Sequence, residues 1–336
     1  MTAFGRSQLC LVAVLAAVAA AIPVSANSAA GPANGLILVT GEAGTRCPGT
    51  ICTVDAGGKN LKQLTSPDAL AAADAGDCGA GCRVTDAAFS SNGKRIAFVV
   101  AGSRVAELWV MNADGTEPRP LTSATAFTQI SENPSWSPNG QSIAFTGKRA
   151  GASSLEIWTI HSDGTTLQAL TTPALTPFAA GPAWSPDGKH IAFTMVGPAA
   201  ISSSPGSPTL LAVIGADGTG LRQLTPPGAD SRQEAAWSPD GRWLAYAYLP
   251  ANSQTTRVAS IYKINADGTG ERRLTRGGFR DADPVISPDG TKIAFSRSRS
   301  TDGQPTPHAF VMSSSGSGVR QLIAYSVEPH SWADER

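Results

Sequence analysis

The sequence predicts an all-β fold, a six-bladed β-propeller built from four-stranded antiparallel blades. The main observation is a phrase of the type Ser-Pro-Asp-Gly that occurs five times, 47 to 53 residues apart, each time followed by an apolar triplet. A second phrase stands between the copies: an apolar strand, an Asp-Gly or similar turn, and then Leu-Thr. A repeat of this length with several strands per unit is typical of propeller blades. The five copies are Ser90–Gly93, Ser137–Gly140, Ser185–Gly188, Ser238–Gly241 and Ser287–Gly290.

Each unit is expected to form a meander of four short strands, and the third unit shows the pattern. Its strands are predicted at 133–137, 142–146, 156–160 and 167–171. The Asn-Gly and Asp-Gly turns between them supply the positive φ angles that tight hairpins need. The large residue near the end of each first strand is interpreted as a packing residue between neighbouring blades. These residues are Phe89, Trp136, Trp184, Trp237 and Ile286.

One blade is divided between the two ends of the chain. Complete units are predicted at 83–122, 130–171, 180–225, 233–275 and 282–323, which makes five. Residues 36–65 contain the last three strands of a sixth unit, and the segment 328–332 repeats the pattern of 132–136. We therefore expect the C-terminal strand to complete the N-terminal blade, which closes the ring and removes its open edges.

The first 26 residues have the pattern of an export signal. Arg6 precedes an apolar run at 9–22, and Val24-Ser25-Ala26 offers small residues for cleavage. The run is shorter than the roughly 20 residues that a membrane-spanning helix needs, although an uncleaved anchor is the alternative. We expect one propeller domain over 27–336, periplasmic or secreted, with no membrane insertion after cleavage.

Charge excludes some partners. The chain has 26 basic and 26 acidic residues, and only 15% of its residues are charged. No basic field is therefore available to attract nucleic acid or an anionic membrane, and no nucleic-acid partner is expected.

Four cysteines follow the predicted signal, namely Cys47, Cys52, Cys78 and Cys82. An even number in an exported protein favours disulfides. Pairing of sequence neighbours would close two small loops, Cys47 with Cys52 and Cys78 with Cys82, and cross-pairing stays open. A four-thiolate zinc site is the alternative, but the spacings lack the paired Cys-x-x-Cys of such sites.

The repeat resembles that of the TolB-type six-bladed propellers. The resemblance is carried by Pro182 to Lys189 with Ile191-Ala192-Phe193, and by Tyr262 to Gly268 followed by Leu274-Thr275. It covers nearly the whole chain after the signal, but without the α/β domain that precedes the propeller in TolB. Similar repeats occur in a periplasmic scaffold, in peptidase propeller domains and in other exported proteins, so the resemblance implies the fold and leaves the function open.

The two faces of the disc should differ. The Ser-Pro-Asp-Gly and Asp-Gly turns all emerge on one uniform face, whereas the opposite face carries variable loops, where recognition is usually placed. Starts of the first strands are expected near the channel mouth on this variable face. Polar residues there are Asp86, Glu132, Asn133, Glu234, Asp283 and Glu328, with His330 beside Glu328.

These residues suggest an acidic funnel for a cation or for the basic or N-terminal end of a partner peptide. Solvated carboxylates and strand-end hydrogen bonds are the structural alternative. The acidic turn at Asp217-Gly218 is interpreted as turn chemistry, because the other ligands of a calcium loop do not follow it.

No catalytic motif is found: the chain has no Gly-x-Ser-x-Gly, no His-Glu-x-x-His and no phosphate-binding Gly-rich loop. The leading hypothesis is a non-catalytic, monomeric propeller without a cofactor that binds a protein or peptide partner. The alternative is a hydrolase or lyase using a divalent cation at the channel mouth, and a third is the gate of a peptidase whose catalytic domain lies on another chain.

Overall fold

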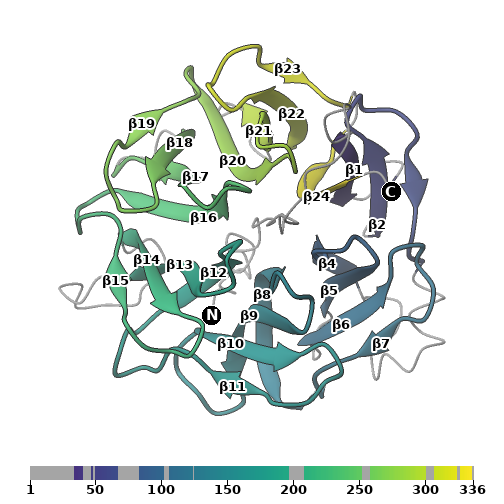
Figure 1. The fold of residues 1–336 in the computed structure, drawn as a ribbon, viewed down its shortest axis with the longest axis vertical. Helices are drawn as coiled ribbons and strands as arrows, with labels where there is room; N and C mark the ends of the chain where they lie inside the picture. Colours follow the sequence, from purple (N-terminus) through teal and green to yellow (C-terminus); the bar gives the residue numbers. More distant parts are fainter. Residues whose placement is uncertain are drawn as a thin grey trace, which may run out of the picture.

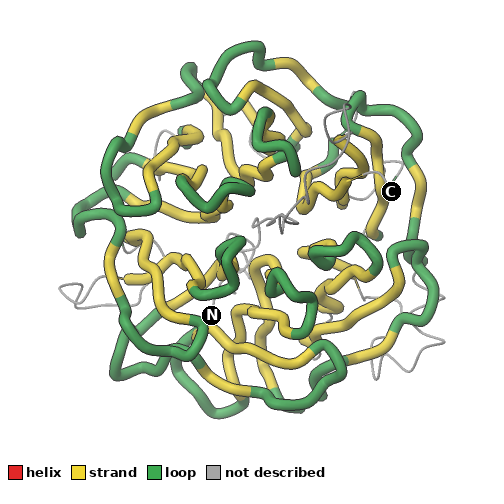
Figure 2. The backbone as a smooth tube through the Cα atoms, viewed as in Figure 1, coloured by secondary structure: helices red, strands yellow, loops and turns green. Residues whose placement is uncertain are grey.

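The computed structural model describes residues 34–40, 47, 50–66, 83–101, 106–123, 125–196, 208–251, 258–299, 306–323 and 326–334. All regular structure in these ranges is β-strand, arranged as six four-stranded antiparallel sheets. Figure 2 shows these strands and their connecting loops without any helix in the described part. The predicted signal at 1–26 and the pair Cys78 and Cys82 lie outside it.

Figure 1 shows the six sheets as blades around a common axis, and the first strand named for each blade below is the innermost. Blade 1 contains β24 (Glu328–Asp334), β1 (Asn34–Thr40), β2 (Ile51–Asp55) and β3 (Lys62–Gln63); blade 2 contains β4 (Arg83–Phe89), β5 (Arg95–Ala101), β6 (Ala106–Asn112) and β7 (Arg119–Pro120); blade 3 contains β8 (Phe127–Trp136), β9 (Ser142–Arg149), β10 (Glu156–His161) and β11 (Gln168–Ala169). Blade 4 contains β12 (Ala179–Trp184), β13 (His190–Val196), β14 (Thr209–Gly215) and β15 (Arg222–Gln223); blade 5 contains β16 (Ser231–Trp237), β17 (Trp243–Leu249), β18 (Ser260–Asn265) and β19 (Arg272–Arg273); blade 6 contains β20 (Phe279–Ile286), β21 (Lys292–Arg299), β22 (His308–Ser313) and β23 (Arg320–Gln321).

The ring closes as predicted. The C-terminal strand β24 pairs antiparallel with β1, with Trp332 opposite Ile37 and Glu328 opposite Thr40. Blade 1 is therefore assembled from both ends of the chain, which gives both β24 and β1 a sheet partner.

The Ser-Pro-Asp-Gly phrase builds a self-contained turn. In blade 4 the Ser185 hydroxyl donates to Asp187 Oδ1 at 2.6 Å and accepts the His190 backbone N–H at 3.0 Å. Asp187 Oδ1 also accepts the N–H of Lys189, and Gly188 has a φ of 72°, which favours glycine. The Asp or Asn at this position therefore accepts hydrogen bonds from N–H groups of the turn. This explains structurally why the residue recurs in the repeats.

The Leu-Thr phrase closes the outer edge of each blade. In blade 4 the Thr225 hydroxyl accepts the backbone N–H of Leu211 on β14 at 3.0 Å, beyond the end of the two-residue strand β15. Four other blades repeat this bond with Thr65, Thr122, Thr171 and Thr275. A threonine thus supplies the acceptor that the short outer strand does not.

The hydrophobic core is divided into clusters between neighbouring blades. One cluster joins Val99 and Leu108 of blade 2 to Trp136 and Phe145 of blade 3, and equivalent clusters occupy the other seams. The Trp136 indole also donates to the carbonyl of Ala88 in the preceding blade at 3.0 Å. The aromatic residues of the inner strands therefore pack between blades, as expected.

Strand lengths differ from the predicted ones. The inner strand β8 begins at Phe127 and not near 133, whereas the outer strand β11 contains only Gln168–Ala169. Both are edge strands of their sheet, but the inner strands also pack against the inner strands of neighbouring blades.

The Cys47–Cys52 disulfide is present, as the neighbour pairing predicted. Both sulfur-bearing residues are fully buried against blade 1. The bond closes the loop between β1 and β2.

Candidate functional site

The uniform face is held together by hydrogen bonds within and between blades. Within blade 4, the Ala216 N–H of the Asp-Gly turn donates to the Lys189 carbonyl of the neighbouring turn at 2.9 Å. Between blades, Arg222 donates to the Ala266 carbonyl in the next Asp-Gly turn at 3.0 Å. Arg119, Arg272 and Arg320 make the same kind of bridge from their blades. These polar groups of the uniform face therefore stabilise the fold by linking turns within and between blades.

The Asp-Gly turns need no ion. Asp217 Oδ1 accepts both the N–H and the hydroxyl of Thr219, at 2.9 and 2.8 Å. These bonds hold the pKa of the Asp217 carboxyl below its usual range. The hydrogen bonds of Asp217 within its own turn thus account for this residue.

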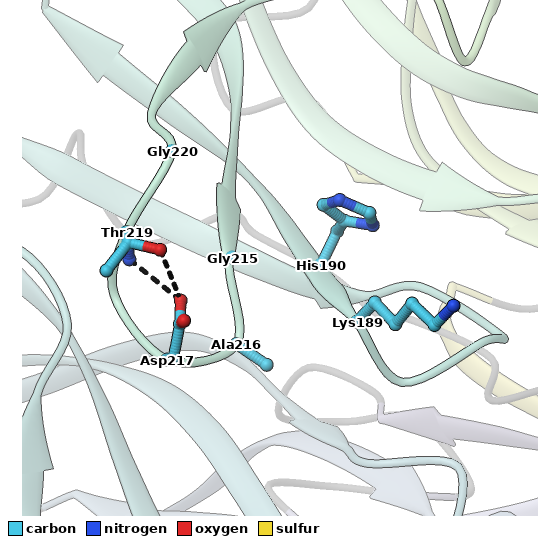
Figure 3. Close-up of a pocket in the computed structure, with 7 residues that line it drawn as sticks. All are labelled: Lys189, His190, Gly215, Ala216, Asp217, Thr219 and Gly220. Carbon is cyan, nitrogen blue, oxygen red and sulfur yellow. Dashed lines mark hydrogen bonds between the residues drawn. The ribbon is translucent and has the colours of Figure 1, made fainter.

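A shallow pocket lies over this same turn (Figure 3). It forms where blade 4 has Gly215, whereas Asn112 in blade 2 and Asn265 in blade 5 cover the equivalent turn by donating to a threonine hydroxyl. Figure 3 shows the Asp217 carboxylate directed to Thr219, apart from the Lys189 and His190 side chains. The labelled side chains that line the pocket do not point toward one another. The lining residues are Lys189, His190, Gly215, Ala216, Asp217, Thr219 and Gly220.

The inner strands share a distinct position near the axis, three residues before the large residue at or near the end of each strand. We call it the axial position. At this position five inner strands have a break in their pairing register with the second strand of the blade, whereas in β24 the break falls one residue later, at His330. Such bulges turn a side chain out of the regular alternation. Going round the ring, the axial residues are Asp86, Asn133, Gly181, Glu234, Asp283 and Pro329.

Three acidic axial residues have left-handed backbones. The φ angles are 50° at Asp86, 61° at Glu234 and 57° at Asp283, while glycine occupies the position in blade 4. This conformation costs a non-glycine residue about 1 kcal/mol or more, and such residues cluster at functional sites. The recurrence of an acid here is a second reason, beyond its charge, to examine this position.

Two of these acids meet across a blade seam. Glu234 on β16 accepts the backbone N–H of Asp283 on β20 through Oε2 at 2.7 Å. Both side chains are buried, with exposures of 5% and 0%. The Asp283 carboxylate also accepts the hydroxyl of Ser296 on β21. Blades 5 and 6 are thus joined through a pair of carboxyl groups, which we call the axial pair.

The axial pair has unusual acidity. Burial, followed by the charge of Asp283, raises the pKa of the Glu234 carboxyl well above its usual range. The nearby Arg280 guanidinium acts in the opposite direction and does not offset this. Two buried like charges at this separation disfavour each other, so the protonated form of Glu234 is preferred.

The structure places the other expected funnel residues differently. Glu234 and Asp283 lie mid-strand because β16 and β20 begin at Ser231 and Phe279, before the expected starts. Asp86 is half-buried on β4, Glu328 is half-buried at the start of β24, and only the backbones of Glu132 and Asn133 on β8 are described. A contact between two of these residues is seen for Glu234 and Asp283.

His330 is buried beside a hydroxyl group. Its Nε2 is hydrogen-bonded to Thr40 Oγ1 on β1, and its Nδ1 has no hydrogen-bond partner among the described residues. Burial lowers the pKa of His330 to about 3, so the ring is neutral at pH 7. This environment is structural in character, in the closing strand of the ring.

The hydroxyl groups near the axis were not anticipated from the sequence. Thr40, Thr146 and Ser296 occupy the same place, directly after the apolar triplet of the second strand. Thr146 accepts the N–H of the axial Gly181, whereas Ser296 donates to Asp283. The recurrence of a hydroxyl residue after the triplet was the available signal.

In the part of the chain that the structure describes, no three His, Cys, Asp or Glu side chains come together as metal ligands. The same residues contain no helix long and apolar enough to cross a membrane.

Comparisons with known proteins agree on the fold. Residues 80–202 match the family model of the TolB beta propeller domain. A curated relative, Uncharacterized protein Atu1656 of Agrobacterium fabrum, is 36% identical over 59 residues, so the match spans only 18% of that relative and 18% of this chain. Among solved structures, TolB from Acinetobacter baumannii has a TM-score of 0.69 at 19% identity, over 90% of this chain and 67% of that one.

A solved enzyme is also similar in fold. Oligogalacturonate lyase in complex with manganese has a TM-score of 0.53 at 13% identity, over 82% of this chain and 71% of that one. At such identities the likeness concerns architecture, which different functions share. Repeat, ring closure and comparisons together show that this chain is a six-bladed β-propeller with a fold similar to that of TolB.

Proposed function

We propose that the chain is an exported, non-catalytic propeller that binds a protein or peptide partner through its variable face and the adjoining end of the axis. The observation that carries this proposal is the set of three acidic residues held with left-handed backbones at equivalent axial positions. Because Glu234 prefers the protonated form, the negative potential of this level comes from the other two acids, and a rigid ring focuses such a potential. That potential favours a basic segment or a free N-terminus of the partner.

The contrast between the two faces supports the same proposal. Carboxylates of the uniform face, such as Asp187 and Asp217, are engaged by their own turns. Variable loops on a rigid scaffold are the usual place for recognition. A partner is therefore expected to gain more binding free energy from contacts with the variable face than from contacts with the uniform face.

Site-specific photo-crosslinking tests this proposal. A photoreactive residue is placed at Ser153 or Ala251, which are exposed near the variable loops, and in matched controls at Thr166 or Thr219, which are exposed on the uniform face. We expect a defined protein adduct from the first two positions in the exporting host and none from the controls. Adducts from the uniform face alone, or from all four positions equally, would contradict the proposed face.

The acidic contribution is tested in the same cells. Replacing Asp86 and Asp283 with Asn keeps the shape of both side chains but removes their negative charges. We expect the adduct from Ser153 to weaken at least tenfold, since partner binding is proposed to use this potential. An unchanged adduct yield from folded protein would remove the axial acids from the binding site.

The alternative of a metal-assisted hydrolase or lyase is favoured by the likeness to oligogalacturonate lyase in fold. Metal analysis of the purified protein separates the two: tightly bound, stoichiometric metal would favour the enzyme, whereas its absence together with a specific adduct favours the scaffold.

A further inference from the structure

The axial pair is the one place in the ring where two neighbouring inner strands both carry an acid at the axial position. The sequence separates the third acid, Asp86, from the pair by Pro329 on one side and by Asn133 and Gly181 on the other. Glu234 reaches over the seam between blades 5 and 6 to the backbone of Asp283, at 2.7 Å from Oε2 to N. The protonation state of this pair therefore affects the contact between blades 5 and 6.

The pair favours a single shared proton. Each carboxyl group accepts one hydrogen bond, Asp283 from the Ser296 hydroxyl and Glu234 from the Asp283 N–H. Glu234 Oε1 is buried and has no hydrogen-bond donor among the described residues. An ionised Glu234 would hold a second negative charge beside Asp283 with that oxygen unsatisfied, whereas a protonated Glu234 can donate to the Asp283 carboxylate. Protonation of Glu234 would therefore remove one of the two negative charges and supply a donor at the seam.

Few other charges act on the pair. Arg280 on β20 is the cation whose charge acts on Glu234. The neighbouring charged groups are engaged elsewhere: Arg232 with Glu271, and Asp281 with Arg297. Other titratable side chains on the packed strands are His190 on β13, Tyr246 and Tyr248 on β17, Tyr262 and Lys263 on β18, Lys292 and Arg299 on β21, and Glu328 and His330 on β24. Of these, Tyr246 bonds to Glu271, Tyr248 bonds to Asp230, and Lys263 lies over Trp243.

We propose that Glu234 and Asp283 form a one-proton lock between blades 5 and 6, closed while they share a proton and opened when alkaline pH removes it. Opening transfers the Glu234 proton to solvent and leaves two buried carboxylates facing each other. Their repulsion loosens the seam and exposes the pair to water. The lock is independent of any partner, so it can fail or hold separately from the proposed binding function.

The sign of the pH effect follows from linkage. The pKa of Glu234 is raised in the folded state, so between the ordinary Glu range and that raised value the folded protein binds one more proton than the unfolded chain. Stability from this group is complete below the unfolded pKa of about 4.3 and is lost as pH rises through the folded value. One proton changes the unfolding constant by at most about tenfold per pH unit.

The test compares wild type, Glu234→Gln and, as matched control, Asp86→Asn, by urea unfolding from pH 5 to pH 9. Gln keeps a donor toward Asp283 without a charge. We expect the unfolding constant of wild type to rise with pH by several-fold more per unit than that of Glu234→Gln. Asp86→Asn should keep the wild-type slope, since Asp86 has no acidic axial neighbour.

Infrared spectroscopy of wild type at pH 7 provides a readout that does not depend on a variant's stability. A protonated, buried carboxylic acid should be visible in its C=O stretch and should disappear as the pH is raised. The lock is wrong if Glu234→Gln retains the wild-type slope, or if wild type shows no protonated carboxyl at pH 7. If Glu234→Gln does not fold, Asp283→Asn is used, which should also flatten the slope.

Discussion

Two buried tryptophans at the same place in different blades allow one hydrogen bond to be measured. Trp136 and Trp332 are each 1% exposed and lie at equivalent positions of the inner strands of blades 3 and 1. The indole N–H of Trp136 donates to the Ala88 carbonyl at 3.0 Å, whereas that of Trp332 has no hydrogen-bond partner among the described residues. The substitutions Trp136→Phe and Trp332→Phe remove the same ring volume but different polar contacts.

The difference between the two variants follows from these contacts. Trp136→Phe loses a hydrogen bond with a net contribution of about 1 kcal/mol. Trp332→Phe loses none and relieves an unsatisfied buried donor, which gains about 1 kcal/mol. We therefore expect Trp136→Phe to be the less stable variant by about 2 kcal/mol, roughly a thirtyfold difference in the unfolding constant.

Urea unfolding followed by far-UV circular dichroism measures this difference, provided that both variants keep the wild-type m-value. The reasoning is refuted if Trp332→Phe is destabilised as much as Trp136→Phe, or more. Such a result would mean that ring packing at the closing blade, and not the indole N–H, decides the cost.

Three further changes have defined outcomes. Gln168→Arg gives blade 3 the outer-strand bridge that Arg222 makes in blade 4, and should raise stability by about 0.5 kcal/mol in low salt; no gain in thermal melting would mean that the bridges are neutral. Arg297→Met leaves the buried Asp281 without its bidentate partner, whose two nitrogens are 2.6 and 2.7 Å away. The free energy of unfolding in urea should fall by about 3–5 kcal/mol, and adding Asp281→Leu should recover most of it. A fall below about 1 kcal/mol would contradict this. The folded pKa of His330 is about 3 and lies below the unfolded value near 6.5, so wild type loses stability as the pH falls below 6.5. His330→Gln should therefore be less destabilised by acid than wild type. An acid-unfolding curve identical to that of wild type would count against this.

The repeat explains why so much of the fold was predictable. A turn such as Ser185 to Gly188 satisfies its own N–H groups, so its residues specify the hairpin wherever they occur. The split blade was predictable for the same reason, since the segment ending at Trp332 repeats one that ends at Trp136. Local chemistry written many times over leaves little ambiguity.

The candidate site was only partly predictable. Its acidic residues could be listed from the repeat, but they were expected at strand starts near a channel mouth. The structure places Glu234 and Asp283 in mid-strand because the inner strands begin earlier and carry a bulge. Strand ends depend on packing by neighbouring blades, which a single-sequence pattern does not contain.

The sequence by itself determined the turn chemistry, which depends on residues close together in the chain, and, through the repeat, the number of blades and the place where the ring closes. The tertiary structure alone decided that Glu234 meets Asp283 and that Ser296 donates to the second carboxylate. It also decided that Trp136 has an acceptor for its indole N–H, whereas Trp332 has none among the described residues. Those relations join residues from different blades or strands. They depend on how blades and strands pack in space. The repeat is alike in every blade and therefore does not specify these contacts.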